Sequence, residues 1–514
     1  MTAVWLARSA TIYVATNGVD ARTGLDYWTN AVATISNGVA KAASAGDVVL
    51  VSNGTYVLAT QVSISAPVTV QSFHNGAVDQ TNTIVNGNAA TRCFTIANTG
   101  AVVNGFTIYN GRATSEGGGI ALSKGTVRNC IIVSNVVDGG GYGGGGIYVS
   151  NYTNVVENCL IAYNTATNGA GIYFYYTASG IVTNCVIRDN WTLAGSSGGS
   201  GGGILMGGDS FPCVLANSII YNNRCTNTGG GVYTDRVYAK IVGCNIYSNY
   251  ANSGGGVLMN HGLITNCNVS NNICNTFGGG ICASYSDASI VNCRVTGNSS
   301  TNTAAGHYGG GVRLSGAMMN NCIIRDNYSG YGAGGVDANN SAGIRNCLVA
   351  GNSALVRGGG MIVENLNLVE NCTVVSNSCP DGGGVWALTQ AGGTNYLANC
   401  IIYYNISSGS ASNYSHAWGF AFASYSNCCL APAISGTSQA YSSNNITADP
   451  RFIGWTNGDY RLRKGSPCIN AGVNQAWMNG AFDLDGHRRV DKFSGIVDIG
   501  CYEYMPNGTL FTVR

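Results

Sequence analysis

The sequence predicts an all-β chain coiled into a parallel β-helix, and three observations support this prediction. A unit of 24 to 32 residues recurs eleven times between about residues 117 and 405. Each unit opens with a glycine cluster and an apolar residue, and later contains Asn-Cys-x-(Ile/Val)-x-x-Asn or a close variant. Around the cysteine, inward apolar residues recur with the period of two that is typical of strands. Such units describe turns that stack about 4.8 Å apart.

Two ladders of identical side chains should run along this coil. Cysteine occupies one ladder in ten units, and Ser218 replaces it in the remaining one. We expect buried free thiols there, because parallel Cβ vectors on adjacent turns keep Cβ atoms slightly beyond the usual disulfide separation. The asparagine five residues after the cysteine suits a corner, because it tolerates the left-handed conformation and bonds to backbone and to the next asparagine. This asparagine ladder comprises Asn135, Asn164, Asn190, Asn223, Asn249, Asn272, Asn298, Asn327, Asn352, Asn377 and Asn405.

The repeat divides the chain into three regions. Residues 47–405 should form the β-helix, with degenerate early turns and roughly 14 turns in all, or roughly 70 Å of coil. Residues 1–46 should form a cap made of a strand and an amphipathic helix, because the apolar residues of 28–45 have helical spacing. Residues 406–514 should form an irregular C-terminal capping region. Caps are expected because the open ends of a β-helix expose strand edges.

Composition excludes two classes of partner. Charged residues make up 9% of the chain, against about 25% in a typical soluble protein. The formal net charge is +1, so no basic field exists to hold nucleic acid or an anionic membrane. No long run of apolar residues indicates membrane insertion. We therefore expect neither nucleic acid nor a bilayer among the partners.

Two parts of the sequence resemble known bacterial families. The glycine–(Ile/Val) and (Ile/Val)-x-x-Asn repeats resemble those of polymorphic outer-membrane proteins, which are adhesins. Five motifs over residues 395–504 resemble, in order, the C-terminal region of surface β-helix proteins called choice-of-anchor Q. These motifs are Asp449-Pro-Arg-Phe452, Gly458-Asp-Tyr-Arg-Leu462, Ser466-Pro-Cys-Ile-Asn-Ala-Gly472, Asp483-Leu-Asp-Gly486 and Asp498-Ile-Gly-Cys-Tyr-Glu503. The resemblance and the handedness rule for parallel crossovers imply a right-handed coil, and the resemblance implies an extracellular or cell-surface protein.

The C-terminal motifs contain two candidate sites. Cys468 and Cys501 fall inside two neighbouring motifs, and we predict a disulfide between them, in keeping with an exported protein. Asp483 and Asp485 present alternate carboxylates that would either hold a structural Ca²⁺ ion or cap backbone amides in a turn. We expect no other cofactor.

The acidic residues of the repeat do not assign a catalytic site. Eleven acids are spread over the eleven units, and none clusters in sequence, so we expect isolated solvated charges and assign no catalytic residue. The best local group is Asp235-Arg236 with Tyr238 and Lys240.

Two outward rows are unusually apolar. One follows the ladder cysteine, and the other follows the inward residue of each glycine corner. The second row supplies a predicted interaction surface made of Tyr148, Tyr173, Tyr233, Leu258 and Trp386. Contiguous apolar rows mark interaction surfaces. They would stack sugars, pack against copies of the chain or another protein, or lie beneath inserted loops.

These observations favour a non-catalytic extracellular structural or adhesive protein. Its partners would be itself or other surface proteins, and two unlike ends would allow head-to-tail filaments. The alternative is a carbohydrate-active enzyme, either a polysaccharide lyase or a glycoside hydrolase, which requires carboxylates and a basic residue on adjacent turns. A glycan-binding module without activity is a further alternative, because the fold alone does not determine function.

Overall fold

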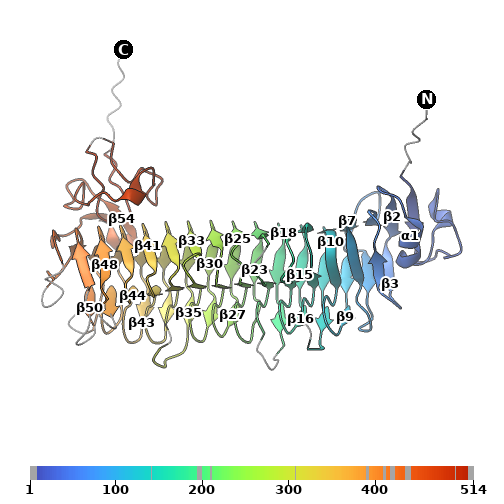
Figure 1. The fold of residues 1–514 in the computed structure, drawn as a ribbon, viewed down its shortest axis with the longest axis horizontal. Helices are drawn as coiled ribbons and strands as arrows, with labels where there is room; N and C mark the ends of the chain where they lie inside the picture. Colours follow the sequence, from blue (N-terminus) through green and yellow to red (C-terminus); the bar gives the residue numbers. More distant parts are fainter. Residues whose placement is uncertain are drawn as a thin grey trace, which may run out of the picture. The chain divides into compact units, whose positions relative to one another are not determined.

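The structure is a computed structural model that describes residues 9–140, 142–193, 199–208, 211–306, 308–388, 393–408, 412–416, 423–434, 442–492 and 494–506. Residues 1–8 of the predicted N-terminal cap lie outside this part. The chain divides into two compact units, residues 1–263 and 264–514, and each is described by itself. Both consist of short parallel strands wound into successive turns, about 14 in total, which confirms the predicted parallel β-helix (Figure 1).

A complete turn passes through four stacks of strands. The first-stack strand follows the glycine corner, and the second-stack strand precedes the ladder cysteine. The third-stack strand follows that cysteine, and a two-residue fourth-stack strand follows the ladder asparagine. Equivalent residues of consecutive turns pair in register, such as Ile147 with Ile172. The side chains that point inward are buried and form the core.

In the first unit, the early turns contain β1 (Thr11–Val14), β2 (Val48–Ser52), β3 (Gly54–Val57), β4 (Val62–Ile64), β5 (Thr69–Phe73), β6 (Thr83–Asn86), β7 (Phe94–Asn104), β8 (Thr107–Tyr109), β9 (Arg112–Ala113), β10 (Ile120–Arg128), β11 (Ile131–Val133) and β12 (Val136–Val137). The first stack continues with β13 (Ile147–Val149), β17 (Ile172–Phe174), β21 (Ile204–Met206), β24 (Val232–Thr234) and β28 (Val257–Met259). The second stack continues with β14 (Asn154–Glu157), β18 (Gly180–Thr183), β22 (Cys213–Ala216) and β25 (Ala239–Val242). The third stack continues with β15 (Leu160–Ala162), β19 (Val186–Arg188), β23 (Ile219–Tyr221) and β26 (Asn245–Tyr247). The fourth stack continues with β16 (Thr165–Ala166), β20 (Trp191–Thr192) and β27 (Tyr250–Ala251).

In the second unit, the first stack contains β32 (Ile281–Ser284), β36 (Val312–Ser315), β40 (Val336–Asn339), β44 (Met361–Glu364), β47 (Val385–Leu388) and β50 (Tyr414–His416). The second contains β33 (Ser289–Val291), β37 (Met318–Asn320), β41 (Gly343–Arg345), β45 (Leu368–Glu370), β48 (Asn395–Ala398) and β51 (Ala423–Ser426), while β29 (Leu263–Thr265) contains the unit boundary. The third contains β30 (Asn268–Ser270), β34 (Arg294–Thr296), β38 (Ile323–Arg325), β42 (Leu348–Ala350), β46 (Thr373–Val375), β49 (Ile401–Tyr403) and β52 (Cys429–Leu430). The fourth contains β31 (Ile273–Cys274), β35 (Ser299–Ser300), β39 (Tyr328–Ser329) and β43 (Ser353–Ala354).

The asparagine ladder is a continuous chain of buried hydrogen bonds within each unit. Asn327 is typical: its Oδ1 accepts the backbone N–H of Asn298 at 2.9 Å and the side-chain amide of Asn298 at 3.0 Å. Its own amide donates to Val295 O at 3.0 Å and to Asn352 Oδ1 at 2.9 Å. The ladder therefore satisfies both side-chain and corner backbone groups, which explains why every unit keeps this residue.

The left-handed corners differ from the prediction. The ladder asparagines themselves do not have positive φ; the residue before each of them does, as at Tyr163 with φ of 57°. A second left-handed corner is the residue before the ladder cysteine, as at Asn129 with φ of 52°. The first glycine of the cluster supplies a third, and at Gly117 a Cβ would lie 2.4 Å from Ile120 O. The prediction assigned the left-handed conformation to the ladder asparagine and not to the asparagine before the cysteine, because both occur at a fixed distance from that cysteine.

The N-terminal cap contains less helix than predicted. A 3-10 helix, η1 (Trp28–Asn30), and α1 (Ile35–Lys41) replace the continuous helix expected over residues 28–45. The chain between them is extended because Val32 forms a parallel bridge with Val14. Thr34 then caps α1 by accepting the N–H of Asn37. Nowhere in the described part of the chain is a helix long and apolar enough to cross a bilayer.

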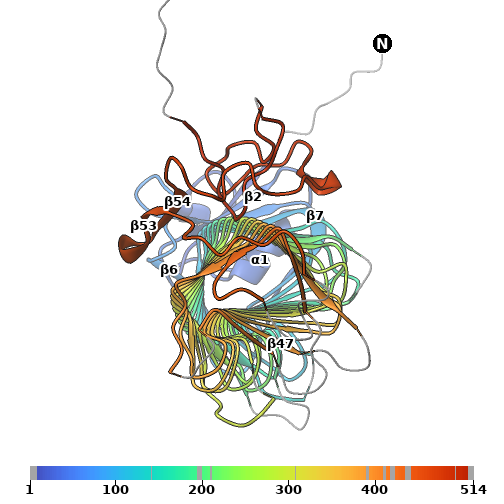
Figure 2. The ribbon, with the colours of Figure 1, turned by 90° about the vertical axis from the view of Figure 1, so that its left-hand side faces the viewer.

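The C-terminal region packs on one side of the second unit's coil. The coil continues past residue 405 through β50, β51 and β52. Beyond it lie β53 (Phe452–Gly454), the 3-10 helix η3 (Trp455–Asn457), β54 (Asp459–Leu462) and the 3-10 helix η4 (Ala476–Met478). Figure 2 shows β53 and β54 outside the coil, and their apolar side chains pack on the third stack of this unit. The apolar row after the ladder cysteine is therefore covered here by the chain's own C-terminal region.

Candidate functional site

The outward row predicted to face solvent is mostly buried. Tyr148, Tyr173, Leu258 and Trp386 are between 4% and 8% exposed, and Tyr233 is half-buried. The strands direct these side chains outward as expected, but other outward-facing and loop side chains pack over them. Of the alternatives left open by the sequence, burial beneath other parts of the chain is the one that the structure favours; a period of two reports the side of the sheet and not what lies on top of it. Its role as an interaction surface stays a prediction.

Five tyrosines, here called the tyrosine patch, lie over the first stack of the first unit. They are Tyr142, Tyr148, Tyr173, Tyr175 and Tyr176. Tyr148 and Tyr173 contact each other edge to face, with ring centroids 5.7 Å apart, and form a buried base. Tyr175 packs 5.9 Å from Tyr148 and contacts Tyr142 at 4.9 Å and Tyr176 at 5.3 Å. Because Tyr142 and Tyr176 are 50% and 56% exposed, the patch presents two rings to solvent on a fixed base.

A buried arginine positions this patch. Arg236 is completely buried, and its guanidinium donates to the carbonyl oxygens of Tyr175 at 2.6 Å, Ala178 at 2.8 Å and Phe211 at 3.0 Å. It therefore fixes the turn after β17 that carries Tyr175 and Tyr176. The sequence had singled out Asp235-Arg236 as the best group for an active site. The three bonds to backbone carbonyl oxygens give Arg236 a structural role, and an active site at Asp235-Arg236 stays a prediction.

One carboxylate acts electrostatically on the patch. Burial raises the pKa of Tyr148, and the negative charge of Glu116 raises it further. The Tyr148 hydroxyl therefore stays protonated near neutral pH. The sequence missed Tyr142, Tyr175 and Tyr176, which lie in loops, although the run Tyr173-Phe-Tyr-Tyr176 and the tyrosine within a glycine-rich stretch were visible signals.

The equivalent outward position of the second unit carries charge. Arg313 on β36 and Asp337 on β40 pair in register, and Arg313 Nη1 lies 3.6 Å from Asp337 Oδ2. Glu364 on β44 lies one turn further and pairs in register with Asn339. Arg357 enters from the loop before β44 and stacks on Tyr331 at 5.1 Å. We call Arg313, Asp337, Arg357 and Glu364 the acid–arginine cluster.

Burial dominates the electrostatics of this cluster. It raises the pKa of Asp337 to about 7, against the opposing effect of Arg313. It also raises the pKa of Glu364, against the opposing effects of Arg313 and Arg357. Both Asp337 oxygens and Arg313 Nη1 are buried without a hydrogen-bond partner among the residues that the structure describes. A carboxyl group that exchanges its proton near neutral pH is suited to proton transfer, but Asp337 is completely buried here.

The acid–arginine cluster overturns the expectation that acids of the repeat are isolated and solvated. Sequence separation hid it, because Asp337 and Glu364 are 27 residues apart. Placing the units in register would have brought them to adjacent turns, two positions apart along the strand. Aligning the units turn by turn could therefore have revealed the cluster from the sequence alone.

The predicted Ca²⁺ ligands make other contacts. Asp483 Oδ1 accepts the N–H groups of Asp485 at 2.9 Å and His487 at 2.7 Å, and its Oδ2 accepts the N–H of Glu503 at 2.8 Å. Both Asp485 oxygens accept from Arg461, at 2.5 Å and 2.8 Å. Asp483, Asp485 and His487 do offer ligand atoms within 4.8 Å of one another. The contacts favour the turn-capping alternative, and a Ca²⁺ site stays a prediction.

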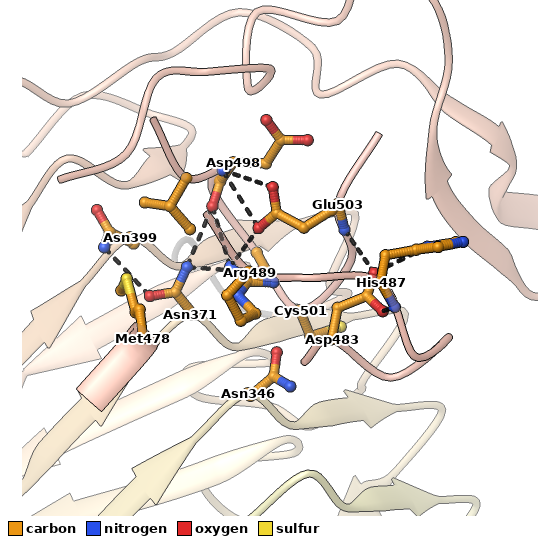
Figure 3. A network of polar contacts seen from close by, with 12 residues as sticks. Asn346, Asn371, Asn399, Met478, Asp483, His487, Arg489, Asp498, Cys501 and Glu503 are labelled. Atoms are coloured by element: carbon orange, nitrogen blue, oxygen red, sulfur yellow. Dashed lines mark hydrogen bonds and ion pairs between the residues drawn. The ribbon is translucent and has the colours of Figure 1, made fainter. Parts of the chain in front are cut away.

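A buried polar network holds the C-terminal region to the coil (Figure 3). Arg489 is completely buried, pairs with Glu503 at 3.0 Å and donates to Gly500 O at 2.9 Å. Burial raises the pKa of Glu503 to about 8, against the effect of Arg489. The left-handed asparagines of three consecutive turns donate to this region; they are Asn346 to Phe482 O, Asn371 to Asp498 O and Asn399 to Val473 O. The network has a structural role, because its charged groups face one another and the protein backbone.

Cys468 and Cys501 lie in the apolar cluster beneath this network. All twenty cysteines are buried free thiols in the structure. The structure thus agrees with the expectation of free ladder thiols, while it contains no bond between Cys468 and Cys501. That disulfide stays a prediction.

Comparisons with known proteins identify the fold class. A family model described as "Right handed beta helix region" matches residues 126–299, so the coil is a right-handed parallel β-helix. The pectate lyase Pel9A is 15% identical, with a TM-score of 0.28 and 96% of each chain covered. The catalytic unit of the GH87 α-1,3-glucanase from Streptomyces thermodiastaticus is 14% identical, with a TM-score of 0.34, covering 80% of this chain and 64% of that one. The A-module of the mannuronan C-5 epimerase AlgE6 from Azotobacter vinelandii is 12% identical, with a TM-score of 0.31, covering 76% and 92%. No curated protein matches the chain.

Proposed function

We propose that the protein is a non-catalytic carbohydrate-binding and adhesive β-helix, and that the tyrosine patch is its glycan-binding site. The observation behind this proposal is the pair of half-exposed rings, Tyr142 and Tyr176, held on a buried tyrosine base. A tyrosine ring offers a flat apolar face for the C–H groups of a sugar and a hydroxyl for its polar rim. Because the base and Arg236 already fix Tyr175 and its neighbours, little side-chain entropy is lost on binding.

The chemistry of the patch favours binding over cleavage. Glycoside hydrolysis generally uses two carboxyl groups on either side of the scissile bond. Among the described residues, Glu116 is the acid whose charge acts on the patch tyrosines Tyr148 and Tyr175. A single carboxylate beside aromatic rings suits a site that holds a glycan without reacting with it.

Affinity electrophoresis in gels that contain neutral polysaccharides tests this proposal. We expect Tyr142→Ala and Tyr176→Ala each to weaken retardation about fivefold, because each removes one stacking face. Tyr396→Ala is the matched control, since Tyr396 is an exposed tyrosine on β48 of the second unit. Unchanged retardation in both patch variants, or equal loss in the control, contradicts the proposed site.

A second candidate function is favoured by the acid–arginine cluster. Carboxylates and basic residues on adjacent turns are what a polysaccharide lyase or glycoside hydrolase on this fold requires. Incubation with acidic and neutral polysaccharides, followed by measurement of new reducing ends and of unsaturated products, tests for such activity. Cleavage that Asp337→Asn and Glu364→Gln abolish would establish the enzyme and overturn the non-catalytic proposal. Cleavage that persists in both variants would place the reaction elsewhere.

The proposal extends to location and assembly. We propose an extracellular or cell-surface location from the resemblance of residues 395–504 to surface proteins, and self-association into filaments from the unlike ends of a coiled chain. Negative-stain electron microscopy of the native protein at several concentrations tests self-association. Regular fibres support it, and separate particles at every concentration contradict it.

A further inference from the structure

We propose that Arg224 of the first unit binds the anionic group of an acidic polysaccharide, at a site separate from the tyrosine patch. Arg224 lies between the rings of Trp191 and Tyr250, and we call these three residues the arginine sandwich. The guanidinium carbon is 5.6 Å from the Trp191 ring centroid and 5.0 Å from that of Tyr250. The sandwich belongs to the fourth stack, whereas the tyrosine patch lies over the first.

The register of the coil builds this arrangement. Trp191, Arg224 and Tyr250 occupy the same outward position on three consecutive turns and pair directly with one another. The residues that follow them, Thr192, Cys225 and Ala251, are buried in the core and anchor each backbone. Since adjacent turns are about 4.8 Å apart, a planar side chain fits between two rings. The guanidinium is therefore held in place before any ligand arrives.

Arg224 differs from Arg188 in having no countercharge among the described residues. It makes no ion pair or side-chain hydrogen bond with any residue that the structure describes. Arg188, one turn away on the third stack, donates to Tyr163 Oη at 2.8 Å and pairs with Asp189. The two rings lie on either side of the Arg224 guanidinium, and Arg224 is exposed, so its N–H groups are accessible to solvent. These N–H groups match a carboxylate or sulfate group bidentately.

The surroundings fit a sugar polymer better than other anionic partners. Trp191 is 52% exposed, so it offers a stacking face beside the cation. Around the corner of the same turns, Tyr221 and Tyr247 stack in parallel at 5.0 Å. Nucleic acid is disfavoured, because its binding needs many phosphate contacts and the chain has a net charge of +1. A chain of uronic acid or sulfated sugars combines ring faces with widely spaced anionic groups.

Affinity electrophoresis with polygalacturonate, heparin and a neutral dextran tests this site and separates carboxylate from sulfate recognition. We expect the wild-type protein to be retarded by at least one anionic polymer, and Arg224→Gln to weaken that binding about tenfold. Arg224→Lys keeps the charge but loses the planar fork, so we expect most of the same loss. Trp191→Ala should weaken binding as well, since it removes one covering ring. Arg294→Gln is the matched control, because Arg294 is an exposed arginine on β34 of the second unit.

Three results would overturn the proposal. They are no retardation of the wild-type protein by either anionic polymer, full binding by Arg224→Lys, and equal losses in Arg224→Gln and Arg294→Gln. The last two would mean that net charge alone is recognised. Because Arg224 is exposed, its variants should fold, and circular dichroism checks this. Tyr142→Ala should retain anionic binding, so failure of this site and failure of the tyrosine patch are distinguishable.

Discussion

The same outward position of the repeat carries opposite chemistry in the two units. In the first unit it holds Tyr148, Tyr173 and Leu205, which pack into an apolar base. In the second unit it holds Arg313 and Asp337, followed by Ile362 and Trp386. The backbone register is equivalent in both, because the asparagine ladder and the inward residues are the same. The inner ladders therefore determine the coil, while the outward position is free to vary.

The two solutions also differ in their energetics. Burying tyrosine and leucine side chains is favourable in itself. Burying Asp337 is costly for its charged form, and the raised pKa of its carboxyl group expresses that cost. The same outward position therefore favours folding in the first unit and opposes it in the second.

Placing a carboxylate at the apolar outward position of the first unit should have the largest effect on stability. Leu205→Asp places an unpaired carboxylate on the apolar base of the tyrosine patch, and we expect it to lower the free energy of unfolding by about 4 kcal/mol or more. Leu366→Asp is the matched control, because Leu366 is exposed in the second unit, and its effect should stay within about 0.5 kcal/mol. Urea denaturation measures both. A loss of less than about 1 kcal/mol in Leu205→Asp would show that the base rearranges to hydrate the charge.

Breaking the shared ladder should affect both units alike. Asn164 makes the same contacts in the first unit as Asn327 in the second, with Oδ1 accepting twice at 3.0 Å and the amide donating to Ile132 O and Asn190 Oδ1 at 3.0 Å. We expect Asn164→Ala and Asn327→Ala each to cost about 3 kcal/mol, because each leaves buried backbone groups unpaired. Asn53→Ala, at an exposed asparagine, should cost little. Clearly unequal costs at the two ladder positions would contradict a common scaffold, and denaturant midpoints decide the matter.

These differences show what the sequence was able to predict. The coil, the two ladders and the inward residues repeat in every unit, so their burial follows from the pattern alone. The burial of Trp386 and Leu348 does not follow from the pattern, because it depends on loops and on a C-terminal segment more than 100 residues away. The acid–arginine cluster lay hidden for a related reason: Glu364 meets Asp337 only when the units are aligned turn by turn.

Removing the buried charge of the second unit should stabilise the protein at alkaline pH. The pKa of the Asp337 carboxyl group is raised in the folded state, so the native protein binds more protons than the unfolded chain between about pH 4 and pH 7. Stability is therefore lost as the pH rises through this window. Asp337→Asn mimics the neutral acid, so we expect no change near pH 4 and a gain of about 2 kcal/mol at pH 8. This is below the linkage maximum of about 4 kcal/mol, since Arg313 loses its countercharge.

Comparison with a solvated acid isolates this effect. Asp326→Asn is the control, because Asp326 is largely exposed one turn before Asp337. Glu503 and Asp498 also have raised pKa values, so they too would make the wild-type protein less stable as the pH rises. The difference between Asp337→Asn and the wild-type protein at each pH removes their contribution. A difference that does not change between pH 4 and pH 8 would show that Asp337 is ionised without cost.

The smallest difference between the two units should be in thiol reactivity, which we expect to be equally low in both while the protein is folded. All twenty cysteines are buried, and burial raises the pKa of Cys93 in the first unit and of Cys501 in the second to about 12 each. A thiol-specific reagent should therefore modify essentially none of them in the native state, in either unit. In denaturant without reductant, twenty reactive thiols would exclude the Cys468–Cys501 disulfide. Eighteen, rising to twenty after reduction, would support that bond and show that the C-terminal region carries a covalent link that the ladder of the coil does not have.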